Sequence, residues 1–142
     1  MPRYLTFGNS TRFGLCDYYG PVIASPEALF LMLAVRPGGL VGGLLQMGVE
    51  KLSRKKEITY LCDLSEFPEE ITTDPDWPLK KKKKGEVIVV PRADIKSLRL
   101  GSWLHSLLTI KTPERTFQAG VSIFKRSKLR EFFTEHGWEL KE

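Results

Sequence analysis

The segment from Ser122 to Trp138 constrains the fold most, because it has the pattern of an amphipathic helix with a marked end. Its apolar stripe consists of Ile123, Phe124, Leu129, Phe132 and Phe133, and its cations, mostly on the other side, are Lys125, Arg126, Lys128 and Arg130. Ser122 suits the N-cap position. Gly137 suits the left-handed position just after a helix, and Trp138 is then expected to pack back on Phe133. A helix with one apolar face needs a surface to cover that face.

The rest of the chain predicts β-structure as that surface. Short runs rich in branched and aromatic residues alternate with turn signals such as Gly8-Asn9-Ser10 and Thr112-Pro113-Glu114. The runs are 4–7, 13–18, 22–25, 28–35, 58–62, 87–90, 95–100, 103–111 and 115–119, with a long irregular connection over 63–85. Phe117 is expected to face the core. We therefore predict an α+β, mainly β fold in which a small curved β-structure is closed by the C-terminal helix.

A glycine-rich helix is predicted over 38–56, after the break at Arg36-Pro37. Its apolar residues recur at helical spacing, but the glycines at 42, 43 and 48 each lower helix propensity by about 1 kcal/mol relative to alanine. Such a helix needs packing, and three arrangements stay open. It folds over its own sheet, it forms an association surface for a homo-oligomer, or it contacts a membrane. The candidate residues of that surface are Leu40, Val41, Leu44 and Leu45.

Two phrases in the second half of the chain are informative. They read Val87-Ile88-Val89-Val90-Pro91-Arg92-Ala93-Asp94-Ile95-Lys96-Ser97-Leu98 and Leu107-Leu108-Thr109-Ile110-Lys111-Thr112. This pattern resembles bacterial pleckstrin-homology-like (GRAM-like) domains, which have a strand ending in Ile-Pro, an Asp-Ile step and a strand of the Leu-x-Ile-x-Thr kind. The resemblance covers about residues 20–138. It implies a single domain over 1–142, a bent β-sandwich or partial barrel plugged by the last helix, with 38–56 as an insertion.

The headgroup site of pleckstrin-homology domains is not carried over by this resemblance. That site uses spaced lysines and arginines across the first two strands and the loop between them. Residues 3–25 contain only Arg3 and Arg12 as basic residues. Phosphoinositide recognition is therefore not implied for this chain.

A run of five lysines, residues 80–84, follows Trp77 closely. Such a run suits an anionic membrane surface, where each cation contributes about 1 kcal/mol. The alternative is a solvated loop that protects a hairpin from aggregation, with acidic residues at 69, 70, 74 and 76 to neutralise it. The candidate partners are thus a protein or an anionic membrane. The candidate binding residues are Trp77, Lys80, Lys81, Lys82, Lys83, Lys84 and Arg92.

Charge, cysteine content and the first residues of the chain limit which compartment and which partners we expect. The net charge of +5 is diluted by 17 acidic residues, so nucleic acid is not an expected partner. Cys16 and Cys62 are far apart and lack ligand-type companions, which indicates reduced thiols rather than a disulfide framework. Residues 1–8 do not have the pattern of a signal peptide. We expect a cytoplasmic protein, with peripheral membrane association left open.

Sequence motifs of catalysis are lacking. The chain has no phosphate loop, dinucleotide fingerprint, nucleophile elbow or His-Glu-x-x-His pattern. His105, expected in a strand beside Trp103, and His136 are too few for a metal site. We predict a non-catalytic binding or adaptor module with no catalytic residues, cofactor or metal. Two alternatives stay open, a membrane-inserted protein using residues 28–49 and an enzyme whose site is assembled from distant residues.

Overall fold

The computed structural model describes residues 3–13, 16–33, 60–63, 67, 75, 77 and 86–142. The predicted helix over 38–56 lies outside the described residues, and so do its candidate association residues. The lysine run at 80–84 lies outside them as well.

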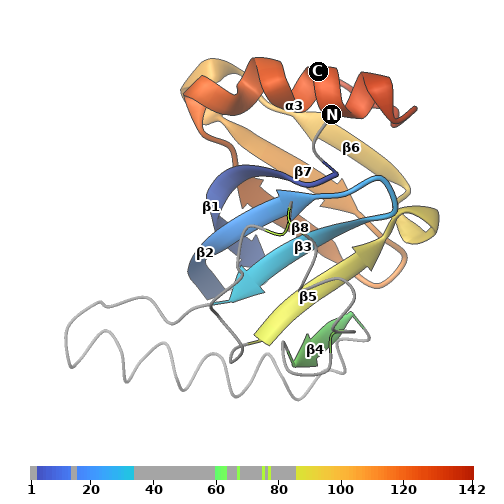
Figure 1. The fold of residues 1–142 in the computed structure, drawn as a ribbon. Helices are drawn as coiled ribbons and strands as arrows, with labels where there is room; N and C mark the ends of the chain where they lie inside the picture. The colour runs from blue at the N-terminus through green and yellow to red at the C-terminus, as the bar shows by residue number, and fades with distance from the viewer. Residues whose placement is uncertain are drawn as a thin grey trace.

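The described residues form eight antiparallel strands, short 3-10 turns and one α-helix (Figure 1). The strands are β1 (Leu5–Phe13), β2 (Cys16–Ala24), β3 (Ala28–Leu33), β4 (Leu61–Asp63), β5 (Glu86–Pro91), β6 (Ser97–Leu100), β7 (Leu107–Lys111) and β8 (Thr116–Gly120). The turns are η2 (Arg92–Asp94), η3 (Trp103–His105) and η4 (Ile123–Lys125), and the helix is α3 (Arg126–Glu135). All strands belong to one sheet with the order β4-β5-β3-β2-β1-β8-β7-β6. The prediction of a mainly β, α+β fold with a C-terminal helix is confirmed.

The predicted turn at Gly8-Asn9-Ser10 is wrong, because these residues lie inside β1. The strand shifts register against β2 on both sides of Gly8, which is the signature of a bulge. A Cβ at Gly8 would lie 1.6 Å from the carbonyl oxygen of Gly120, so only glycine permits this close approach. The predicted strand over 13–18 is also wrong, because Phe13 pairs with Cys16 across a hairpin.

β3 is buried on both of its faces. Leu29 and Leu31 belong to the main core, whereas Phe30 and Met32 belong to a second cluster that contains Trp77. Since successive side chains of a strand point to opposite faces, burial of both faces explains why the run is apolar throughout. Residues 28–33 of the segment considered for membrane insertion are therefore an inner strand. No helix within the described ranges has the length and apolarity needed to span a membrane.

Helix α3 lies across one end of the curved sheet, where its apolar side completes the main core (Figure 1). Leu129, Phe132 and Phe133 are buried there, as the sequence predicts. The other two residues of the predicted stripe, Ile123 and Phe124, are exposed in η4. Their assignment to the buried stripe is wrong, because the α-helix begins only at Arg126 and the preceding turn points them outward.

The C-terminal end of α3 follows the predicted cap. Gly137 has a φ of 74°, in the left-handed region. The amide of Trp138 donates to the carbonyl of Phe133 at 2.8 Å, and the amide of Gly137 donates to that of Thr134 at 3.3 Å. These two bonds define a Schellman motif. The rings of Phe133 and Trp138 are 5.2 Å apart, so the predicted packing is confirmed.

Most of the remaining predicted strands match observed ones. β5 and β8 lie where the apolar runs indicated, and Phe117 is fully buried. The run predicted over 103–111 is only partly a strand, because its first residues form η3. His105 is therefore in a 3-10 turn, and its assignment to a strand is wrong.

Candidate interaction surface

Two 3-10 turns lie side by side at one end of the molecule. η3 joins β6 to β7, and η4 joins β8 to α3. Because β7 pairs with β8, the two connections leave the sheet next to each other. The amide of Val121 donates to the carbonyl of Ser106 at 2.8 Å, which ties the segment before η4 to the segment after η3.

Arg126 fixes the two turns to each other. Its Nη2 donates to the carbonyl of Gly101 at 2.6 Å, and its Nη1 donates to the hydroxyl of Ser106 at 3.0 Å. The same Nη1 approaches the carbonyl of Ser102 at 3.4 Å. Arg126 is buried, although the sequence places it among the cations of the solvent side. The first residue of α3 therefore bonds to the backbone before η3 and to the Ser106 side chain after it.

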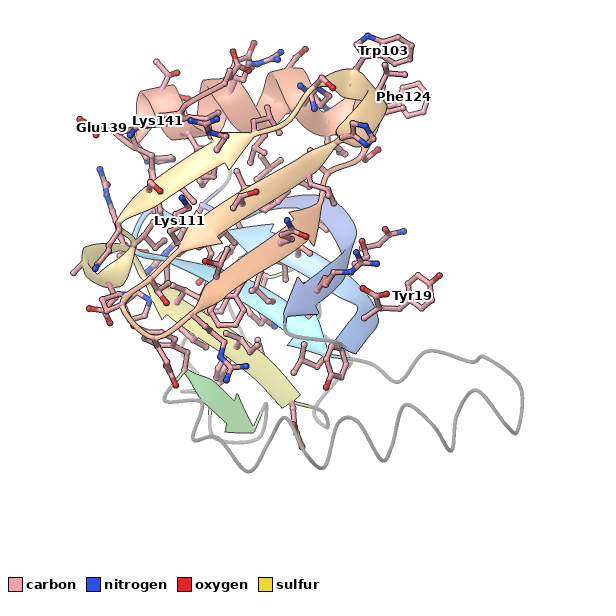
Figure 2. All side chains as sticks on the ribbon, turned by 180° about the vertical axis from the view of Figure 1, so that it is seen from behind. Tyr19, Trp103, Lys111, Phe124, Glu139 and Lys141 are labelled. Atoms are coloured by element: carbon pink, nitrogen blue, oxygen red, sulfur yellow. The ribbon has the colours of Figure 1, made fainter. Side chains whose placement is uncertain are left out.

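Four large apolar side chains project from these turns. Trp103 is 66% exposed, Leu104 69%, Ile123 57% and Phe124 91%. We call these four residues the apolar tip. Figure 2 shows Trp103 and Phe124 at the same corner, both directed away from the body of the molecule.

Most of the exposed large hydrophobic residues that the structure describes gather at this corner. Among the described residues, six large hydrophobic side chains are exposed, namely Tyr19, Trp103, Leu104, Leu107, Ile123 and Phe124. Four of them lie in the two turns, and a fifth, Leu107, is the first residue of β7, two positions after η3. Scattered exposed apolar residues need no explanation, whereas a contiguous group on a soluble domain marks an interaction site.

The segment of the chain that bears the apolar tip is rich in cations and poor in acids. Residues 95–113 contain no acidic residue, and residues 115–130 contain none either. Over 95–130 there are eight lysines and arginines against the single acid Glu114, which gives a net charge of +7. The whole chain carries +5, so all other residues together carry −2. The positive excess of the protein thus lies in the segment that bears the tip.

Trp77, a predicted binding residue, has a core position. Its side chain is only 1% exposed, and its ring contacts those of Tyr4, Phe30 and Phe67 at centroid distances of 5.2, 5.5 and 5.9 Å. This aromatic cluster covers the outer face of β3. The structure therefore gives Trp77 a packing role rather than an accessible surface.

Arg92 is the second predicted binding residue that the structure describes, and its guanidinium makes contacts within the fold. Its Nη1 donates to the carbonyl of His136 at 2.8 Å, and its Nη2 donates to that of Gly137 at 2.6 Å. The guanidinium also lies 5.0 Å from the ring centroid of Trp138. Cations are favourable at a helix C-terminus because the last carbonyls carry partial negative charge. Arg92 thus anchors the C-terminal end of α3.

A groove of about 320 Å³ lies beside Arg92. It is lined by Arg92, Ile95, Lys96, Ser97, Leu98, Gly137, Trp138, Glu139 and Lys141. Its ionisable groups carry both signs, and the Arg92 guanidinium is already bonded to two carbonyls. Within the described parts of the chain, no three His, Cys, Asp or Glu residues come together as a metal site. The groove therefore gives a weaker indication of a ligand than the apolar tip does.

The tip leaves a signal in the sequence that the helix and strand patterns hide. Gly101-Ser102 precedes Trp103-Leu104, and Gly120-Val121-Ser122 precedes Ile123-Phe124. In each case a turn-prone segment is followed by two large apolar residues in an acid-free stretch.

None of the family models, curated proteins or solved structures with which the chain was compared matches this chain.

Proposed function

We propose that the chain is a non-catalytic binding module of pleckstrin-homology-like fold that acts by presenting the apolar tip to a partner. The observation that carries the proposal is the exposure of Trp103, Leu104, Ile123 and Phe124 on two turns that are tied together by a backbone hydrogen bond and by the Arg126 side chain. The fold assignment is supported by the curved antiparallel sheet and by the helix across its end, the arrangement that the resemblance of residues 87–112 implies.

The filled interior supports a binding role over a catalytic one. The space between the strands and α3 is occupied by a continuous cluster of buried apolar residues, including Phe7, Phe117 and Phe133. A pocket in the middle of the sheet structure would need those side chains to be smaller. At the tip itself the side chains are hydrocarbon and indole, and these groups bind by burial rather than by proton transfer.

Burial of the apolar tip by a partner is energetically favourable. Full burial of one large apolar side chain contributes about 1.5–3 kcal/mol. Four such side chains exposed together give a driving force that offsets much of the entropy lost on association. Because Arg126 already holds both turns, little further ordering of the backbone is needed when a partner binds.

Site-specific photo-crosslinking tests this proposal whatever the chemical class of the partner. The benzophenone analogue of phenylalanine is placed at position 124 of the full chain in the cells from which the chain comes. We expect discrete adducts at this position, visible as a gel shift for proteins or as a mass increment for lipids. The additional change Trp103→Ser is expected to lower their yield, since it removes a neighbouring contact.

Thr134 supplies the matched control, because it is exposed on the same helix but lies away from the tip. The photoreactive residue at position 134 is expected to give no discrete adduct. Equal adduct patterns from both positions, or none from position 124, would contradict a binding role for the tip.

A further inference from the structure

We infer that the partner of the apolar tip is an anionic lipid bilayer, which takes up the four apolar side chains while nearby cations contact its headgroups. The inference rests on the proposed function, since it names the partner of the same surface. Three features of the described residues lead to it, namely the shape of the tip, the lysines next to it and the types of its side chains.

The shape of the tip suits a soft, continuous phase. Trp103 and Phe124 project outward from separate turns at a corner of the molecule rather than lining a concavity (Figure 2). A protein partner would need an apolar concavity shaped to receive both of them. A bilayer adapts its surface to a protruding group, and amphipathic elements bury their apolar side to the boundary between headgroups and acyl chains.

The charges suit anionic headgroups. Lys125 lies within η4 and Lys128 is exposed one turn into α3. The nearest acidic residues along the chain are Glu114 and Glu131. Glu114 lies in the turn between β7 and β8, at the other end of these strands, and Glu131 lies within α3, three residues after Lys128. Anionic membrane surfaces attract such cations over a distance of about 10 Å, set by the Debye length. Attraction brings the tip to the membrane, and apolar burial keeps it there.

The side-chain types suit the membrane interface. Trp103 combines a large apolar ring with one N–H donor, a combination that is enriched where hydrocarbon meets water. Leu104, Ile123 and Phe124 have no polar atom in their side chains and suit the acyl region. The lysine run at 80–84 can supply only electrostatic attraction, so the two candidate membrane contacts make different predictions.

Tryptophan fluorescence provides a direct readout of insertion. The chain has three tryptophans, all within the described residues, and Trp77 and Trp138 are buried whereas Trp103 is exposed. The full chain is mixed with vesicles of phosphatidylcholine alone or of phosphatidylcholine with phosphatidylglycerol. We expect binding and a blue shift only with the anionic vesicles, quenching by lipids brominated on the acyl chain, and loss of the blue shift in Trp103→Phe.

Substitutions at the tip separate insertion from attraction. Phe124→Ser is expected to weaken vesicle binding by about tenfold or more, because it removes an aromatic side chain that the bilayer buries in the bound state. The double change Lys125→Ser and Lys128→Ser is expected to weaken binding at low salt and to reduce its salt dependence. Tyr19→Ser is the matched control, since Tyr19 is also exposed but lies away from the tip (Figure 2), and this change is expected to leave binding unchanged.

Several results would overturn the inference. Binding that is insensitive to Phe124→Ser but abolished when Lys80 to Lys84 are changed to serine would assign the membrane contact to the lysine run. Absence of vesicle binding together with protein adducts at position 124 would leave the binding module in place and make its partner a protein. Absence of both would remove the proposed function as well.

Discussion

The two ends of α3 each have a phenylalanine and a tryptophan, yet the fold buries one pair and exposes the other. At the C-terminal end, Phe133 and Trp138 stack within the main core. At the N-terminal end, Phe124 and its neighbour Trp103 project into solvent. The same residue types at the same helix thus have opposite environments.

Both ends are held by an arginine, which makes the contrast informative. Arg92 donates to the carbonyls of the two residues that follow the helix, His136 and Gly137, and lies over the ring of Trp138, so it helps to bury that ring. Arg126 bonds instead to backbone and hydroxyl groups around η3, and the rings of Trp103 and Phe124 stay largely exposed. The backbone of the tip is therefore ordered while its side chains stay accessible. Accessibility here is a property of an ordered structure rather than of a loose end.

The largest expected effect comes from truncating the buried pair. Phe133→Ala removes a fully buried ring and is expected to lower the free energy of unfolding by about 3–5 kcal/mol. Phe124→Ala removes an exposed ring and is expected to change it by no more than about 0.5 kcal/mol. Urea titration followed by circular dichroism measures both.

A less disruptive substitution at position 133 allows the two positions to be compared even where Phe133→Ala does not fold. Phe133→Leu retains most of the buried volume and is expected to fold even where Phe133→Ala does not. Equal losses of stability for Phe124→Ala and Phe133→Leu would mean that the tip contributes to folding, and would argue against its role as a free surface.

A smaller effect is expected from the two cations beside these ends. Arg92→Met removes two hydrogen bonds to the carbonyls that follow α3 and is expected to cost about 1–2 kcal/mol of stability without weakening vesicle binding. Lys125→Met is expected to have the reverse pattern, with stability unchanged within about 0.5 kcal/mol and weaker vesicle binding. Vesicle binding that depends on Arg92 but not on Lys125 would reverse our assignment of the two residues.

The C-terminal end of α3 was predictable because its signals are local. Gly137 is placed to adopt the left-handed conformation, and the hydrogen bonds that follow join residues only three to five positions apart. Those bonds bring Phe133 and Trp138 next to each other. Local backbone chemistry of this kind can be read from one segment of sequence.

The N-terminal end is mispredicted because the sequence pattern starts the helix at Ser122, whereas α3 begins only at Arg126. Even in a helix that began at Ser122, with about 100° per residue, Phe124 would lie about 140° from Leu129, whereas Arg126 would lie about 60° from it. The period therefore favours burial of Arg126 and exposure of Phe124, which is what the structure has. The actual partners of Arg126, at Gly101 and Ser106, depend on sheet pairing and cannot be read from the helix segment.

The β-strands show the same division between local and distant information. The apolar run of β3 indicated a strand, but only the sheet order explains why both of its faces are buried. Gly8-Asn9-Ser10 resembled a turn because glycine and asparagine favour turns. The close approach of Gly120 to Gly8 turns this segment into a bulge within a continuous strand, and that contact joins distant parts of the chain.

The smallest expected effect concerns pH and distinguishes the two helix ends once more. Tyr60 lies against the main core, and burial raises the pKa of its phenol, with the charge of Asp94 and a hydrogen bond to that carboxylate adding to the shift. Asp94 belongs to η2, the turn that also supplies Arg92 to the buried end of α3. The four side chains of the apolar tip, by contrast, carry no titratable group.

A raised pKa means that folding favours the neutral phenol, so its contribution is fully present below the unfolded value of about 10 and is lost as pH rises through the folded pKa. The free energy of unfolding of the parent chain is therefore expected to fall more steeply between about pH 9 and about pH 11 than that of Tyr60→Phe. Trp103→Phe, at the exposed end, is expected to follow the parent, since it leaves Tyr60 and Asp94 in place. Urea titrations across this range measure the difference in slope, and identical slopes for the parent and Tyr60→Phe would show that Tyr60 does not couple the buried end to pH.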